Sequence, residues 1–339
     1  MLETNPQYLQ PDSDNKDYPL VSVIINCYNG ERYLREAIDS VYAQTYPNWE
    51  IIFVDNASVD QTAVIANSYD NRLKYFRNPL TVKLGESRNI ACRHAEGEFL
   101  AFLDCDDVWM PNKLELQIPQ FLENPSVGIV ISNAGYIKQR KILEGRVAIT
   151  HQQASKGVYT FSDILSSYFI ILSSVTIRAD SLRSLNQWFD TTLNITEEAD
   201  LFLRLAVNWK MTLVNQVLCY YRLHDTNTHK TYEVIPFPDE IHHIFLKLDN
   251  MDSEYSKDKD YQSHKTKWLN MAHETVLYFN WREGNIGSAY KGLFQIKPLT
   301  FRNYAKQLLC LFLIPLKDKG LHLYSILVSV FGKNGPSLL

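Results

Sequence analysis

Short apolar runs and segments of helical periodicity alternate through residues 21–131. Five mainly apolar runs predict strands: VSVII at 21–25, IIFV at 51–54, LKYF at 73–76, EFLAFL at 98–103 and VGIVI at 127–131. Most of them lack polar alternation and are rich in β-branched or aromatic residues, which is typical of strands buried on both faces of a parallel sheet.

Helices are predicted between these runs, where apolar residues recur at helical spacing. They lie near 31–44, around 64–66, from about 85 to 95 and after Pro111. Ser58, with Gln61 three places later, has the pattern of a cap for the second of these helices. Gly97 is placed as the C-terminal stop of the third.

Strands that alternate with helices imply an α/β fold with a doubly wound, mostly parallel sheet of Rossmann-like type and right-handed crossovers. Sheets of this kind bind ligands beyond the carboxyl ends of their strands. Polar residues cluster at three such ends, at 26–29, 55–56 and 104–107. We therefore expect the functional site at this edge of the sheet.

The alternation loosens in the second half of the chain. The pattern predicts strands at 172–177 and 213–217, a helix at 198–209 and a mainly helical region from 235 onward. The segment 286–339 combines leucines and aromatic residues with six lysines, one arginine and a single acid. We expect it either to lie on an anionic membrane surface or to pack as a helical cap with its lysines in water.

Composition and charge narrow the class of protein. The chain has 339 residues, of which 45% are hydrophobic and 21% charged, with a net charge of -4. These values are typical of a soluble globular protein and give no general attraction to nucleic acid. The five scattered cysteines form no CxxC pair, which favours a reducing compartment.

No apolar run approaches the length that spans a bilayer, and the first twenty residues lack the apolar core of a secretory signal. We therefore expect a cytoplasmic protein. The segment 286–339 is the candidate for a peripheral contact with the inner face of the membrane.

The turn that follows the strand at 98–103 contains three carboxylates, Asp104, Asp106 and Asp107. Such groups repel one another unless a positive charge lies between them. Mg²⁺ or Mn²⁺ suits that place, because hard cations take oxygen ligands and keep positions open for a substrate diphosphate. A solvated turn or a helix cap is the alternative. The position directly after a buried strand favours the metal site.

Five segments in order resemble family 2 inverting glycosyltransferases of the GT-A fold: VSVIINCYN at 21–29, VDNASVDQT at 54–62, GESRN at 85–89, GEFLAFLDCDD at 97–107 and EEADLFLRL at 197–205. The family usually has proline at the place of Asn26 and V-D-D-G-S where this chain has VDNAS. The resemblance implies a nucleotide-diphosphate sugar as donor, with a UDP-sugar as the first candidate.

The resemblance also implies roles for single residues. Tyr28 would pack on the nucleobase, Asp55 would accept a hydrogen bond from it, and Arg88 would hold the base or the diphosphate. Asp104 would face the ribose and the metal, and Asp106 would ligate the metal. Ordinary structural roles stay open beside these: core packing for Tyr28, a turn cap for Asp55 and an ion pair for Arg88. Asp107 would ligate the metal or cap the next helix.

Inversion by single displacement needs one carboxylate to take the proton from the acceptor hydroxyl. Where the family usually offers aspartate for this, the chain has Glu198, and Asp200 is the reserve candidate. Glu197 would orient or cap. The alternative for all three is an acidic helix N-terminus favoured by the helix dipole.

The stretch CYYRLH at 219–224 resembles the Y-R-x-H that often follows in this family. By this resemblance His224 would reach the metal or diphosphate, and Arg222 the phosphates. The Q-x-x-R-W signature of processive synthases is absent from the sequence, which favours transfer of a single sugar.

The expected organisation is a polar tail at 1–18, a catalytic domain at 19–232 and a helical region at 233–339. Within the catalytic domain, 19–110 would bind the nucleotide and 111–232 the acceptor. The acceptor would be a saccharide or a lipid-linked saccharide. Two other functions stay open: a nucleotidyltransferase, whose phosphate loop would be richer in glycine and lysine than 26–31, and an inactive carbohydrate-binding protein on the same fold.

Overall fold

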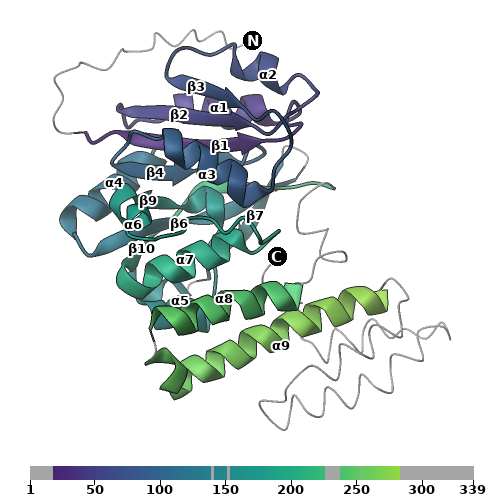
Figure 1. The fold of residues 1–339 in the computed structure, drawn as a ribbon. Helices are drawn as coiled ribbons and strands as arrows, with labels where there is room; N and C mark the ends of the chain where they lie inside the picture. Colours follow the sequence, from purple (N-terminus) through teal and green to yellow (C-terminus); the bar gives the residue numbers. More distant parts are fainter. Residues whose placement is uncertain (1–17, 139–140, 151–152, 226–236, 253, 283–339) are drawn as a thin grey trace. The chain divides into compact units, whose positions relative to one another are not determined.

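The computed structural model describes residues 18–138, 141–150, 153–225, 237–252 and 254–282 (Figure 1). The chain divides into two compact units. The first contains the chain up to Thr160, with Ile170–Asp190 and Leu205–Leu223. The second contains Phe161–Phe169, Thr191–Arg204 and the chain from His224 onward. The domain boundaries expected from the sequence stay a prediction.

The first unit is built on one sheet with the strand order β3-β2-β1-β4-β9-β6-β10-β5. Its strands are β1 (Val21–Cys27), β2 (Trp49–Asp55), β3 (Leu73–Arg77), β4 (Phe99–Phe102), β5 (Val108–Trp109), β6 (Val127–Lys138), β9 (Thr176–Arg178) and β10 (Lys210–Leu223). Off this path, β7 (Lys141–Val147) pairs with β6 and β8 (Val158–Tyr159) pairs with β10.

The long strands of this sheet are parallel. β1 pairs in parallel with β2 and β4, β2 with β3, and β6 with β10. The short β9 is antiparallel to both β4 and β6, so those two strands run in the same direction. The mostly parallel α/β sheet expected from the alternating pattern is confirmed.

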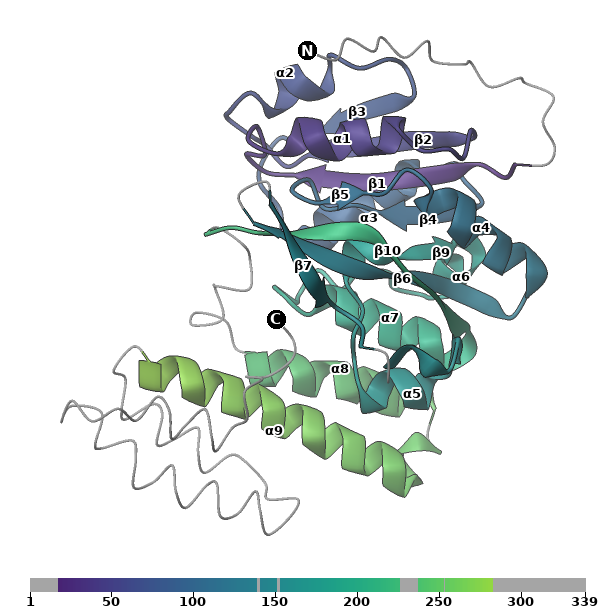
Figure 2. The ribbon, with the colours of Figure 1, turned by 180° about the vertical axis from the view of Figure 1, so that it is seen from behind.

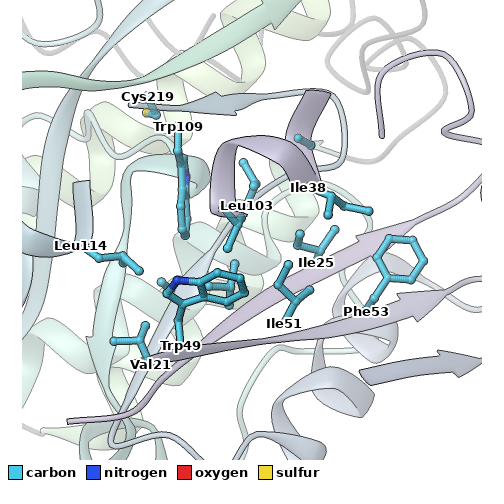
Figure 3. Close-up of a cluster of buried hydrophobic side chains, with 14 of the residues drawn as sticks. Val21, Ile25, Ile38, Trp49, Ile51, Phe53, Leu103, Trp109, Leu114 and Cys219 are labelled. Carbon is cyan, nitrogen blue, oxygen red and sulfur yellow. The ribbon is translucent and has the colours of Figure 1, made fainter. Parts of the chain in front are cut away.

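Helices cover both faces of the sheet of the first unit: α1 (Leu34–Tyr42), α2 (Thr62–Ala66), α3 (Leu84–His94), α4 (Lys113–Glu123) and α6 (Ala179–Arg183) belong to this unit. The second unit contains α5 (Phe161–Ser166), the first part of α7 (Glu197–Asn208), α8 (Phe237–Met251) and α9 (Lys259–Arg282). α1 and α3 lie on opposite faces of the sheet (Figures 1 and 2). Buried side chains from β1, β2, β5, α1 and α4 form a hydrophobic core on one of these faces, and Trp49 and Trp109 are among them (Figure 3).

Two local expectations need correction. The helix predicted after Ser58 forms, but its N-cap is Gln61 without a side-chain bond, because the Ser58 hydroxyl accepts a bond from the Asn29 N–H instead. Gly97 does not end α3, whose C-cap is Ala95. A Cβ on Gly97 would lie 2.6 Å from the Ser22 nitrogen, so glycine is needed there for the close approach to β1.

The strand predicted at 172–177 is also only partly present. Residues Leu172–Ser174 form a 3-10 turn, called η2 below, and β9 begins at Thr176. The strand predicted at 213–217 lies within β10. In the described ranges no helix combines the length and apolar character needed to cross a bilayer. The basic segment 286–339 lies outside the described residues.

Ala57, in the turn after β2, has a φ of 64°. This left-handed conformation costs a residue with a Cβ about 1–2 kcal/mol, and glycine avoids the cost. We predict that Ala57→Gly raises the free energy of unfolding by about 1 kcal/mol. Ala63→Gly, within α2, is the control and should lower it by about 1 kcal/mol. Urea unfolding of both variants checks this, and a loss of stability in Ala57→Gly would contradict it.

Candidate functional site

Loops at the carboxyl ends of β1 and β2 are tied to each other by reciprocal hydrogen bonds. The Asn29 N–H donates to the Ser58 hydroxyl at 2.9 Å, and the Val59 N–H donates to Asn29 Oδ1 at 2.9 Å. Asn29 has a φ of 52°, a conformation that asparagine tolerates better than most residues. The Gly30 N–H also reaches Thr62 Oγ1 at 2.9 Å. These bonds fix the two loops as one rigid edge.

Tyr28 stands at this edge with 54% of its surface exposed. The alternative of core packing therefore does not apply to it. An exposed aromatic ring next to rigid loops can stack on a planar ligand group. Its contact with a nucleobase stays a prediction.

Asp55 is fully buried at the end of β2 and accepts three hydrogen bonds. Its Oδ1 accepts from the Ser58 N–H at 2.8 Å, and its Oδ2 from the Tyr75 hydroxyl and an Arg77 nitrogen, each at 2.7 Å. Burial and the bond to Asp55 raise the pKa of Tyr75, so that tyrosine stays a donor. Asp55 thus caps the turn. The Arg77 guanidinium, which pairs with Asp55, is itself half-exposed.

Asn56 stands where the related family usually has a second aspartate. Its Oδ1 accepts from the Val82 N–H and from Asn78 Nδ2, each at 2.9 Å. Its Nδ2 donates to the Val82 carbonyl at 2.8 Å, which a carboxylate could not do. The amide therefore holds the loop that leads into α3, the helix that carries Arg88.

The three carboxylates of the acidic turn after β4 differ in how deeply they are buried. Asp107 is fully buried, with Oδ2 accepting from the Ser173 hydroxyl at 2.6 Å and Oδ1 from the Arg222 N–H at 2.8 Å. Asp104 and Asp106 are partly exposed. Arg88 is 3% exposed and reaches Asp104 Oδ1 at 3.2 Å. Asp107 is thus the internal anchor of the turn, and the other two carboxylates remain accessible.

Ser173, in η2, supports this turn from one side. Its hydroxyl oxygen accepts from the Asp104 N–H at 3.1 Å while donating to Asp107. The Ser173 carbonyl accepts from Trp109 Nε1 at 2.8 Å, and the Lys113 ammonium lies 4.1 Å from the Trp109 ring centre. Burial lowers the pKa of Lys113 to about 7. This stack of buried groups holds η2 against the turn.

Arg222, at the end of β10, supports the turn from the other side. It is 1% exposed, and its Nε donates to the Asp106 carbonyl at 2.6 Å. One terminal nitrogen donates to Glu36 at 2.7 Å, and the guanidinium lies 4.5 Å from the Tyr33 ring centre. Arg222 therefore anchors the backbone of the turn, and its contact with donor phosphates stays a prediction.

The turn fits a divalent cation that takes part of its ligands from elsewhere. Within the described residues, no group of three His, Cys, Asp or Glu side chains could hold a metal by itself. The partial burial of the Asp104 carboxyl and the Asp106 charge raise its pKa, against the opposing effect of Arg88. A dication between these two carboxylates would relieve that repulsion, with a diphosphate or water completing its oxygen shell.

The candidate bases lie in the first turn of α7, in the second unit. Glu198 is partly exposed, whereas Glu197 and Asp200 are buried. The Asp200 carboxylate accepts from Arg204 at 2.6 Å and lies 2.6 Å from the Lys247 ammonium. Asp200 is therefore paired with two cationic side chains. His224 is partly exposed at the start of the last segment of this unit, and its ligand role stays a prediction.

Sequence reasoning missed Arg77, Ser173 and Glu36. Arg77 could have been found by pairing the ends of the two parallel strands, because it ends β3 directly opposite Asp55. No sequence signal marks Ser173 or Glu36. Ser173 bonds to Asp107 and Glu36 to Arg222, and each partner lies far away in the chain.

We predict that Ser173→Ala lowers the free energy of unfolding by about 1–3 kcal/mol, because it removes a donor from the buried Asp107 carboxylate. Ser174→Ala is the control: that hydroxyl donates only to the neutral Ile171 carbonyl, and its loss should cost about 1 kcal/mol or less. Guanidinium unfolding measures both. Equal losses in the two variants would contradict the anchoring role of Ser173.

Comparisons with known proteins show the family of the chain. Residues 22–167 match the model of Glycosyl transferase family 2. An uncharacterized glycosyltransferase of Rickettsia typhi is 33% identical over 220 residues, which cover 63% of this chain and 67% of that protein. The Escherichia coli UDP-Glc:alpha-D-GlcNAc-diphosphoundecaprenol beta-1,3-glucosyltransferase WfgD is 39% identical over 145 residues, covering 42% of this chain and 56% of that protein.

Solved structures share the fold at low identity. TarS 1-349 of S. aureus in complex with UDP-GlcNAc superposes with a TM-score of 0.61 at 20% identity, covering 82% of this chain and 81% of that one. The mannosyltransferase PcManGT of Pyrobaculum calidifontis, in complex with GDP-Man and Mn2+, gives 0.56 at 18% identity, covering 93% and 84%. The fold is that of GT-A glycosyltransferases, and the chain belongs to glycosyl transferase family 2 and is a glycosyltransferase.

Proposed function

We propose that this enzyme moves a single sugar from a nucleotide-diphosphate sugar to an acceptor hydroxyl, with inversion at the anomeric carbon. The observation that carries the proposal is the acidic turn, in which buried Asp107 holds Asp104 and Asp106 partly exposed at the carboxyl end of the sheet. The UDP-GlcNAc complex of TarS and the UDP-Glc substrate of WfgD make a UDP-sugar the first donor to test.

The donor nucleotide would lie along the edge formed by the loops after β1, β2 and β4. Tyr28 would stack on the base, since its ring is exposed beside the fixed loops. The ion pair of Asp55 and Arg77 would face the edge of the base through the half-exposed guanidinium. Arg88 would balance the charge of Asp104 next to the ribose and diphosphate.

Mg²⁺ or Mn²⁺ held by Asp106 and Asp104 would neutralise the charge that develops on the leaving nucleoside diphosphate. The Mn2+ bound with GDP-Man in PcManGT supports this choice of ion. The protein would present the two carboxylates in fixed positions. Arg222 donates to the Asp106 carbonyl, and the Asp104 N–H donates to the Ser173 hydroxyl. His224 would add a ligand or a phosphate contact.

Glu198 would act as the general base. The acceptor oxygen attacks the anomeric carbon opposite the leaving group, its proton passes to the Glu198 carboxylate, and the diphosphate leaves with the bonding electrons. The partial exposure of Glu198 favours it over Asp200, whose carboxylate is buried between Arg204 and Lys247.

The acceptor would be a saccharide or a lipid-linked saccharide, and the biological role the assembly of a surface polysaccharide or glycolipid. The diphosphoundecaprenol substrate named for WfgD supports a lipid-linked acceptor. A cytoplasmic location, with contact to the inner face of the membrane through 286–339, would fit such an acceptor. The net charge of -4 offers no support for a nucleic-acid partner. Family membership supports sugar transfer over nucleotidyl transfer or an inactive binding protein.

We expect Asp106→Ala to lose at least about 100-fold in donor turnover, because the metal then has one carboxylate fewer at the diphosphate. Turnover is read as nucleoside diphosphate released from a panel of UDP- and GDP-sugars with MnCl₂. Asp180→Ala, at an exposed aspartate of α6, is the control and should be unchanged. Turnover within tenfold of wild type in folded Asp106→Ala would refute the metal assignment.

Glu198→Gln should lower turnover by about 100-fold or more while the dissociation constant for UDP with Mn²⁺ stays within twofold, because only proton transfer is removed. Calorimetry gives the dissociation constant, and the same release assay gives turnover. Unimpaired turnover in this variant would move the base to Asp200.

A further inference from the structure

Glu240 is a buried carboxylate in the first turn of α8, 4% exposed. Its Oε1 accepts from the N–H and the side-chain amide of Asn194, at 2.9 and 2.7 Å. Its Oε2 accepts from the Thr196 hydroxyl at 2.8 Å and from the Ile195 N–H at 3.4 Å. A carboxylate has about four acceptor sites, so these four donors use its full capacity. One side chain therefore fixes three consecutive residues.

These three residues lead directly into the helix that carries the candidate base. α7 begins at Glu197, and the Thr196 carbonyl accepts its first helical bond, from the Asp200 N–H at 2.9 Å. Thr196 is thus at the N-cap position. Glu198 is the second residue of the helix. The place of its carboxylate depends on how 194–196 enters the helix.

A second contact from α8 lies one turn farther along α7. Lys247 approaches Asp200 at 2.6 Å, and Asp200 is four residues after Thr196. Glu240 and Lys247 are seven residues apart and so share one face of α8, just as Thr196 and Asp200 share one face of α7. An anion and a cation on α8 therefore hold the first turn of α7 at two points, which fixes both its rotation and its position along the axis.

We propose that Glu240 is a positioning residue for the general base, acting through 194–196 on the carboxylate of Glu198. The inference rests on the proposed role of Glu198. Four N–H and O–H donors converge on one carboxylate, and without it the buried Thr196 hydroxyl and the three partly buried donors of 194–195 would lose the acceptor they share. Glu240 lies beyond the matched residues 22–167, so under this proposal a residue of the region at 233–339 contributes to catalysis.

The test measures hydrolysis of UDP-glucose, UDP-GlcNAc and GDP-mannose with MnCl₂. Glu240→Ala should lower kcat by about 10- to 100-fold, because a displacement of the base by about 1 Å has effects of this size. KM and the dissociation constant for UDP should stay within twofold. Glu240→Gln keeps one acceptor oxygen and should fall between wild type and Glu240→Ala. Glu254→Gln, at an exposed glutamate of the second unit, should match wild type.

Amide hydrogen exchange gives a readout that does not depend on turnover. Exchange in 194–200 should become at least about tenfold faster in Glu240→Ala, with little change in the first unit. A purely global destabilisation would instead raise exchange across both units and overturn the proposal. So would a Glu240→Gln variant that fails to fold, since the residue would then be needed for stability alone, and so would unchanged kcat in folded Glu240→Ala.

The double variant Glu198→Gln/Glu240→Ala separates this proposal from the proposed base. If Glu240 acts through Glu198, adding Glu240→Ala to Glu198→Gln costs no further activity. Additive losses would show that Glu240 acts by another route and would overturn the inference. If Glu198→Gln alone is unimpaired, the assignment of the base has failed, and the exchange data on 194–200 report on the contacts of Glu240 separately.

Discussion

The site depends on one buried carboxylate, Asp107, in a turn that contains two more. Carboxylates this close repel one another, so a turn carrying three of them is unstable unless their environments differ. The Ser173 hydroxyl and the Arg222 N–H hold Asp107 inside from two sides. Burial and the two neighbouring acids raise the pKa of Asp107 well above its usual range. The strand order explains how this arises, because β9 and β10 bring η2 and Arg222 to the end of β4.

Buried carboxylates organise three turns that carry candidate site residues in the same way. Asp55 collects donors from the loop after β2 and from β3, Asp107 from η2 and β10, and Glu240 from the segment before α7. These turns lie between regular elements, where N–H groups lack helix or strand partners. A carboxylate accepts several such donors at once and forms stronger bonds than a neutral acceptor. Near each buried acid, other charged side chains stay partly exposed, namely Arg77, Asp104 with Asp106, and Glu198.

The sheet was predictable from the sequence, because apolar runs are local signals. The strand-end polar clusters are local signals too, and they predict the place of the candidate site. The strands at 21–25, 51–54 and 98–103 are present with nearly the expected limits. Long-range contacts were not predictable. Nothing local marks Gly97 as the point where the chain passes the Ser22 nitrogen, or Arg222 as a buried anchor of the acidic turn. The ion pair of the buried Asp200 with Lys247 joins α7 to a helix that follows much later in the chain.

The central claim is that the exposed pair in the acidic turn holds a dication against the donor diphosphate. Crystals grown with UDP and MnCl₂, measured at the manganese absorption edge, test it most directly. The account predicts an anomalous difference peak bonded to the Asp106 carboxylate and to oxygens of the UDP diphosphate. UDP bound at this edge of the sheet with no manganese peak at Asp104 or Asp106 would contradict it.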